Sequence, residues 1–145
     1  EPEGKGTDTP GALQYLNQIQ RRKAIIFLLS DFLPGKQERE GELFHMLGLT
    51  NRRHDVSCII LADPREIELP DIGWITLEDA ESGEQVKVNT GNPKFRKAFA
   101  EANRKRVEDL EGELRQRGID YVHATTDTPY MHALRTYFNL RNRRR

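Results

Sequence analysis

Residues 23–32 read KAIIFLLSDF, and this stretch decides the fold. Its centre, residues 25–29, is a run of five apolar residues. Such a run is too short for a typical buried helix and has the length of a strand that is covered on both faces. It ends in Ser30 and Asp31. Ligands of open parallel sheets bind beyond the carboxyl ends of the strands, so we expect Asp31 at a functional edge.

Apolar runs and helical patterns alternate on both sides of this stretch. A second strand pattern, VSCIILA, occupies residues 56–62, and a third lies near residues 120–125. Apolar side chains recur at helical spacing over about residues 9–22, 37–49 and 93–117, and another helix is expected to begin at Thr128 and Pro129. We expect Thr9 to cap the first helix, with Pro10 as its first residue. This alternation predicts a parallel sheet with right-handed crossovers.

One segment interrupts the alternation. Residues 74–77 and 85–88 are short strand patterns, and the polar sequence EDAESGE lies between them. This pattern predicts an inserted β-hairpin near residues 74–88. We expect residues 1–145 to form a single domain, with a leader at residues 1–8 and a basic tail at residues 139–145.

Composition restricts the class of protein. Charged residues make up 32% of the 145 residues and balance to a net charge of zero, which gives no general attraction to nucleic acid or to a membrane surface. The terminal RNRRR could contact phosphates, but a short basic terminus is more often a solvated tail. No apolar stretch approaches the roughly 20 residues that a membrane span needs. Cys58 is the one cysteine, so we expect a reducing, cytoplasmic setting without disulfides.

Thr7 and Asp31 are the candidate metal ligands. Thr7 precedes a helix and Asp31 follows a strand, and a hydroxyl and a carboxylate at one sheet edge could hold Mg²⁺, which prefers oxygen ligands. The alternative is that both residues only cap helices. Asp63, Arg65 and Glu66 follow the second strand, where an ion pair that shapes the turn is a simpler interpretation than an active site.

The other reactive side chains fit structural roles. None of the four histidines has a partner at zinc-site spacing, and no phosphate-binding loop is present. Cys58 lies inside an apolar run without an adjacent base, which favours a core position. We therefore expect no catalytic and no cofactor-binding residues. The histidines are His45, His54, His123 and His132.

From about residue 6 to residue 138 the chain resembles the C-terminal part of the DUF58 family. The matching segments are GTD at residues 6–8 with AL at 12–13, LSDF at 29–32, RHDV at 53–56, DPRE at 63–66, ELPDIG at 68–73 and LEDAESGE at 77–84. The resemblance implies a three-layer α/β sandwich, the C-terminal portion of a von Willebrand A-like (Rossmann-like) domain that lacks its first strands. It also implies an association with MoxR-type AAA+ ATPases.

The same resemblance implies a metal-ion-dependent adhesion site. Such a site combines a DxSxS loop, a threonine and an aspartate, and here Thr7 matches the threonine and Asp31 the aspartate. The DxSxS loop has no counterpart in this sequence and is expected upstream of Glu1. We expect an incomplete and empty site in this chain. In the intact protein, an acidic group of a partner would complete the shell of a Mg²⁺ ion.

Two functional hypotheses follow. Without the DxSxS strand, residues 25–29 would form an unpaired sheet edge, so we expect a homodimer through that edge. The favoured function is protein–protein interaction without catalysis, with a MoxR-type ATPase as the partner that the family resemblance implies. The alternative is a Mg²⁺-dependent hydrolase or phosphoryl-transfer domain that uses Asp31 and Asp63. Whether the parent protein is anchored to a membrane stays open.

Overall fold

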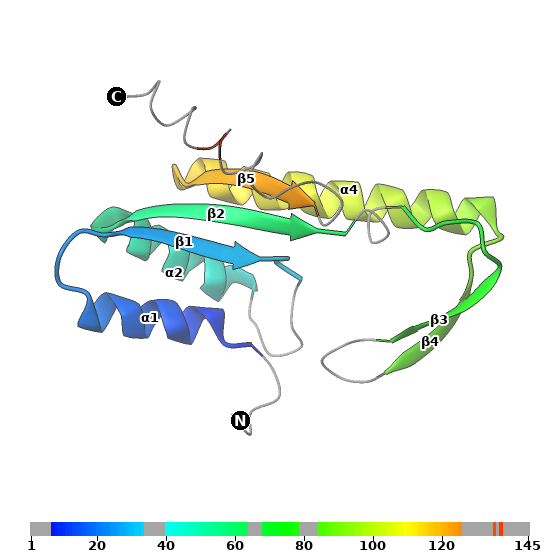
Figure 1. The fold of residues 1–145 in the computed structure, drawn as a ribbon, viewed down its shortest axis with the longest axis horizontal. Coiled ribbons are helices and arrows are strands. Elements are labelled where there is room, and N and C mark those ends of the chain that lie inside the picture. The colour runs from blue at the N-terminus through cyan, green and yellow to red at the C-terminus, as the bar shows by residue number, and fades with distance from the viewer. Residues whose placement is uncertain are drawn as a thin grey trace.

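The structure is a computed structural model that describes residues 7–33, 40–63, 68–78, 84–125, 135 and 137. Helices and strands alternate along most of this range, as Figure 1 shows. In chain order they are α1 (Thr9–Ile19), β1 (Ile25–Ser30), α2 (Glu40–Arg53), β2 (Asp55–Ala62), β3 (Trp74–Glu78), β4 (Gln85–Asn89), α4 (Pro93–Gln116) and β5 (Asp120–Thr125).

The main sheet has three parallel strands in the order β1-β2-β5. Ile25 lies opposite Asp55, and Ser57 lies opposite Asp120. The parallel sheet and the positions of its three strands were predicted from the apolar runs, and the structure confirms both. Because all three strands run in the same direction, their carboxyl ends share one edge of the sheet, which we call the rim.

All three described helices of this region cover one face of the sheet. Every second residue of the strands faces them, because side chains alternate across a strand. The resulting core is apolar and includes the fully buried Leu47 of α2 and Leu114 of α4. Its buried members are Leu13, Leu43, Leu47, Val56, Cys58, Ile60, Leu110, Leu114 and Ile119.

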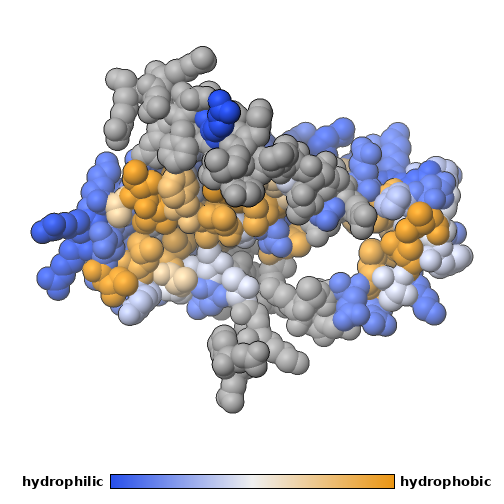
Figure 2. All heavy atoms as spheres, in the orientation of Figure 1, coloured by the Kyte–Doolittle hydropathy of each residue, from blue (hydrophilic) through white to orange (hydrophobic). Residues whose placement is uncertain are grey.

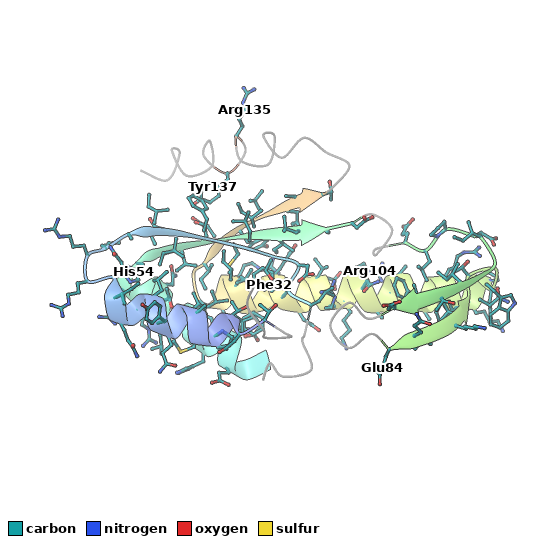
Figure 3. The ribbon with its side chains drawn as sticks, turned by 60° about the horizontal axis from the view of Figure 1, so that its bottom comes forward. Phe32, His54, Glu84, Arg104, Arg135 and Tyr137 are labelled. Carbon is teal, nitrogen blue, oxygen red and sulfur yellow. The ribbon has the colours of Figure 1, made fainter. Side chains whose placement is uncertain are left out.

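The opposite face of the sheet differs from the prediction. A strand covered on both faces was expected at residues 25–29, but in β1 exposed and half-buried residues alternate. In the described part of the chain, Tyr137 covers a portion of this outer face: its ring meets the Phe27 ring edge-on at 5.7 Å and its hydroxyl hydrogen-bonds to that of Ser57. Figure 3 shows Tyr137 on the side of the sheet away from the helices. Ile25 and Leu29, the other two outer side chains of β1, are more than half exposed.

Helix boundaries differ from the sequence-based estimates by a few residues. The carboxylate of Asp8 caps α1 by accepting a hydrogen bond from the Gly11 N–H (2.9 Å), so the expectation that Thr9 is the cap was wrong. Helix α2 runs to Arg53, four residues beyond the helical pattern at residues 37–49. Of the helix expected after Thr128, only Arg135 and Tyr137 are described, and both are helical. Residues 1–6, 64–67, 79–83 and 139–145 lie outside the described residues.

The predicted hairpin is present and forms a second, two-stranded sheet. Strands β3 and β4 are antiparallel, with Trp74 opposite Asn89. The buried Thr90 holds its base, because its hydroxyl accepts from the Ile72 N–H (3.2 Å) and donates to the Gly73 carbonyl (2.8 Å). In Figure 1 the hairpin stands apart from the main sheet, beside the start of α4. No helix in the described ranges has the length and apolar character that a membrane span needs.

Candidate functional site

The candidate site lies at the rim of the main sheet. Helix α1 returns into β1 through a short connection, so its first turn lies at the same end of the sheet as the end of β1 (Figure 1). Thr7 precedes α1 by two residues, and Asp31 directly follows β1. Asp63 directly follows β2, and Thr125 ends β5. The chain therefore brings a hydroxyl and carboxylates from separate segments toward one edge.

The end of β1 is a tight turn that its own side chains hold. The Phe32 N–H donates to the Ser30 hydroxyl (3.0 Å), and the Leu33 N–H donates to Oδ1 of Asp31 (3.1 Å). Phe32 has a φ of 51°, in the left-handed region that a bulky side chain rarely adopts. The turn therefore carries local strain and leaves the second carboxylate oxygen of Asp31 outside this hydrogen bond.

Arg106 of α4 connects that turn to the helix layer. Its Nη1 donates to the Asp31 carbonyl (3.5 Å) and to the Phe32 carbonyl (3.4 Å). Its Nε is buried and has no hydrogen-bond partner among the described atoms. The Arg106 guanidinium beside Asp31 makes this corner of the site positively charged as well as acidic.

A cleft of about 610 Å³ opens between the rim and α4. Its charged lining is mixed, with three basic residues and four acidic ones: Lys97, Arg104, Arg106, Asp31, Glu68, Glu101 and Glu108. Figure 3 shows Phe32 where β1 ends and Arg104 on α4. The volume is in the range of small-ligand sites, but the balanced charges select neither an anion nor a cation strongly.

The role of Thr7 and Asp31 as ligands of a metal ion stays a prediction. Thr7 and Asp31 are both exposed, and they lie next to the start of α1 and the end of β1. Within the described ranges, no group of three His, Cys, Asp or Glu side chains could hold a metal ion. Two ligands from this chain fit only part of the octahedral shell of Mg²⁺, so a tight site needs further oxygen ligands. Arg65 and Glu66, which were considered with Asp63, lie outside the described residues.

The second functional feature is the outer face of β1, which we call the open side of β1. In the described part of the chain β1 pairs with one strand, β2. On its outer face Ile25 is 58% exposed, Phe27 39% and Leu29 58%. Figure 2 shows apolar surface gathered over this part of the main sheet. Exposed apolar side chains gathered on one face form a surface that other proteins can bind.

Sequence reasoning missed Arg106. The sequence places it in a row with Ala102 and Leu110 at four-residue spacing, and Leu110 belongs to the core. Residues at four-residue spacing lie on the same face of a helix, so Arg106 lies beside the apolar side of α4. A charged residue at such a position was the available signal that Arg106 contacts another part of the chain. The carbonyl groups that Arg106 contacts are 74 and 75 residues away in the sequence, so its role could not be read from local pattern.

Comparisons with known proteins identify one family and several uncharacterized relatives. The family model described as "Protein of unknown function DUF58" matches residues 1–109. An uncharacterized protein of Mycobacterium avium is 33% identical over 131 residues, which are 90% of this chain and 73% of that protein. Uncharacterized proteins of Mycobacterium bovis and Mycobacterium tuberculosis are 33% identical over 132 residues, and the chain spans 39% of their length. No solved structure matches the chain.

Proposed function

This chain belongs to the DUF58 family of proteins of unknown function, and from that premise we propose that it is a protein-interaction domain without catalytic activity of its own. The observation that supports this proposal is the open side of β1. Strands of parallel sheets are usually covered on both faces, whereas Ile25 and Leu29 on the outer face of β1 are each 58% exposed. Exposed apolar surface of this kind is typical of binding sites for other proteins.

The rim supplies a second, metal-dependent contact in the intact protein. We propose that Thr7 and Asp31 contribute two oxygen ligands to a Mg²⁺ ion, as the resemblance to von Willebrand A-like domains implies. An acidic side chain of the partner would complete the shell, because Mg²⁺ favours six oxygen ligands. Arg106 would position Asp31 through its contacts with the carbonyl groups of the turn.

The proposed partner is a MoxR-type AAA+ ATPase, which the family resemblance implies. The longer relatives contain more than twice the length that this chain covers, so such a complex involves the whole protein. For this chain, the relevant prediction is that the open side of β1 contributes to binding. Residues of β1 and of the hairpin have similar exposure, which allows a matched comparison between them.

The test measures binding of the purified chain to a purified MoxR-type ATPase by surface plasmon resonance. Ile25→Glu should weaken binding by about tenfold or more, because it places a charge in an apolar contact. Ile72→Glu is the matched control, since Ile72 is 65% exposed but lies beside the hairpin. Equal affinities of the Ile25→Glu variant and the control would contradict the proposal. Asp31→Ala in the longer protein should remove the dependence of binding on Mg²⁺.

A hydrolase or phosphoryl-transfer domain is the second candidate. Asp31 and Asp63 follow neighbouring parallel strands, and Asp31 lines the cleft at the rim. Cys58 does not supply a nucleophile for such a reaction. Burial raises the pKa of its thiol to about 12, so the thiol stays protonated. Mg²⁺-dependent turnover of phosphatase substrates that both Asp31→Ala and Asp63→Ala abolish would favour the enzyme.

A further inference from the structure

The cleft at the rim has the position and size of a small-ligand site. Its apolar lining comes from the end of β2 and from α4, and includes Leu61, Ala62 and Val107. Ligands of parallel α/β sheets bind beyond the carboxyl ends of the strands, which is where this cleft lies. Its volume of about 610 Å³ accommodates a molecule of the size of an amino acid. The charged side chains of the lining then decide which molecule the cleft accepts.

Four of the seven charged residues in the lining form two ion pairs along α4. Lys97 Nζ lies 4.0 Å from Oε1 of Glu101, one helical turn away. Arg104 Nε lies 3.8 Å from Oε1 of Glu108, again one turn away. Opposite charges at such short distances largely cancel for a ligand that is further away. These two pairs therefore give the cleft little net charge.

The other three charged residues of the lining form no ion pair within the described part of the chain. Arg106 donates to the carbonyl groups of Asp31 and Phe32, which carry no net charge. The Asp31 carboxylate accepts a hydrogen bond from the Leu33 N–H and pairs with no basic group of the described residues. Glu68 is exposed and has no ion pair among them either. The cleft thus offers one cation and two anions that a ligand can neutralise.

The arrangement of these charges indicates the chemistry of the ligand. Arg106 and Asp31 are neighbours, because Nη1 of Arg106 lies 3.5 Å from the Asp31 carbonyl oxygen. An α-amino acid carries its carboxylate and its ammonium on the same carbon atom, so its head group can meet a guanidinium and a neighbouring carboxylate together. Glu68 remains for a second cation. One negative and two positive charges on one small molecule describe a basic α-amino acid.

We propose that the cleft binds a basic α-amino acid of the lysine type. Arg106 binds its carboxylate, Asp31 binds its α-ammonium group, and Glu68 binds the cation of its side chain. The methylene groups of the ligand lie against Leu61 and Val107 of the apolar lining. This site goes beyond the proposed function, since it uses the cleft and not the open side of β1.

Calorimetric titration of the chain with L-lysine and three analogues tests the proposal. The buffer contains EDTA, so that no divalent cation competes for Asp31. Nα-acetyl-lysine lacks the charge of the α-ammonium group, lysine amide lacks that of the carboxylate, and Nε-acetyl-lysine lacks that of the side chain. Each analogue should bind about tenfold more weakly than lysine, because it leaves one charged group of the cleft without a partner. No binding of lysine, or equal binding of lysine and all three analogues, would overturn the proposal.

Variants of the chain assign each ligand charge to its residue. Glu68→Gln should weaken lysine binding by about tenfold and should bind Nε-acetyl-lysine as well as lysine. This variant should keep the fold, because Glu68 is exposed and lies outside the helices and strands. Asp31→Asn should lose only the preference over Nα-acetyl-lysine. Its side chain keeps an acceptor oxygen for the Leu33 N–H.

The role of Arg106 needs a readout that a loosened turn would not produce. Arg106→Gln should lose the preference for lysine over lysine amide and should keep the preference over Nε-acetyl-lysine. Arg106→Lys keeps a cation and should keep both preferences. A merely structural role would weaken lysine and the analogues alike in Arg106→Gln, and this result would overturn the assignment of the carboxylate to Arg106.

Two matched variants control for the change in net charge. Glu42 is exposed on α2, and Lys105 of α4 lines the groove beside α2; neither contributes to the lining of the cleft. Glu42→Gln and Lys105→Gln should therefore bind lysine with the affinity of the wild type. If Glu42→Gln weakened lysine binding as much as Glu68→Gln, net charge and not a contact would explain the loss, and the role of Glu68 would be overturned.

The outcomes also separate this inference from the proposed function. A chain that binds no lysine, while Ile25→Glu still weakens binding to the ATPase, overturns the amino-acid site and leaves the binding role of β1 intact. Lysine binding in which each variant loses the preference assigned to it supports the site, whatever the ATPase does.

Discussion

At the scale of single residues, Glu111 joins α4 to β5. Its Oε1 accepts a hydrogen bond from His123 Nε2 (2.8 Å), and its Oε2 accepts from the Tyr121 hydroxyl (3.1 Å). Arg115 also reaches Oε2, at 3.4 Å. The hydrogen bond from His123 holds the pKa of Glu111 below its usual value, and burial together with Glu111 raises the pKa of Tyr121. The cluster ties the last strand of the sheet to the longest helix.

Glu111→Gln should lower the free energy of unfolding by about 1 kcal/mol at pH 7, since charge-assisted hydrogen bonds become neutral ones. A carboxyl whose folded pKa is lowered stabilises the protein above its unfolded pKa, here 4.5, and that stabilisation is lost as pH falls through the folded pKa. The difference between wild type and variant should therefore shrink from pH 5.5 to pH 3 in urea denaturation. Glu108→Gln is the control, because its pair with Arg104 is exposed on both sides.

The other single-residue predictions had mixed outcomes. Cys58 is fully buried in the core, as its apolar neighbours in the sequence predicted. His54 is also buried, which agrees with a structural role, while its two ring nitrogens have no hydrogen-bond partner among the described atoms. The roles of Thr7 and Asp31 as metal ligands depend on groups outside this chain and stay predictions.

At the scale of elements, the start of α1 depends on one carboxylate. Asp8 accepts a hydrogen bond from the Gly11 N–H and lies so close that a Cβ added at Gly11 would be 2.1 Å from its Oδ2. Gly11 therefore provides the space that the cap needs. Thr9 was a reasonable candidate from sequence, because threonine and aspartate both cap helices, and the choice between neighbouring caps depends on where the backbone turns.

Asp8→Ala should destabilise the chain by about 1 kcal/mol, because the first N–H groups of α1 lose their acceptor. Asp8→Asn keeps an acceptor oxygen and should retain most of the stability. Urea denaturation followed by circular dichroism measures both variants. Equal losses in the two variants would show that the negative charge of Asp8, and not its capping hydrogen bond, stabilises α1.

At the scale of the whole molecule, stability is concentrated in the main sheet and its helix layer. The core cluster contains residues of α1, α2, β2 and α4, and none of the described residues of the hairpin belongs to it. In the hairpin, Trp74 and Val86 are largely exposed. A two-stranded hairpin alone is marginally stable in water, so we expect it to add little to the free energy of unfolding.

Leu114→Ala should therefore lower the free energy of unfolding by about 2–5 kcal/mol, because it opens a cavity at a fully buried position. Val86→Ala should change it by less than about 0.5 kcal/mol. Chemical denaturation measures the free energy of unfolding of both variants. A loss of similar size in Val86→Ala would mean that the hairpin folds together with the core.

The sequence by itself determined the elements and the architecture of the main sheet. Apolar runs at residues 25–29 and 56–62 indicated parallel strands, and the polar interruption after Leu77 indicated the hairpin, because strand periodicity and turn chemistry are local properties of a chain. Only the tertiary structure decided that Arg106 holds the turn after Asp31, that Glu111 meets His123, and that the outer residues of β1 are more exposed than the inner ones. Those features join residues that are distant in the sequence, and whether a strand is covered depends on which other segments reach it.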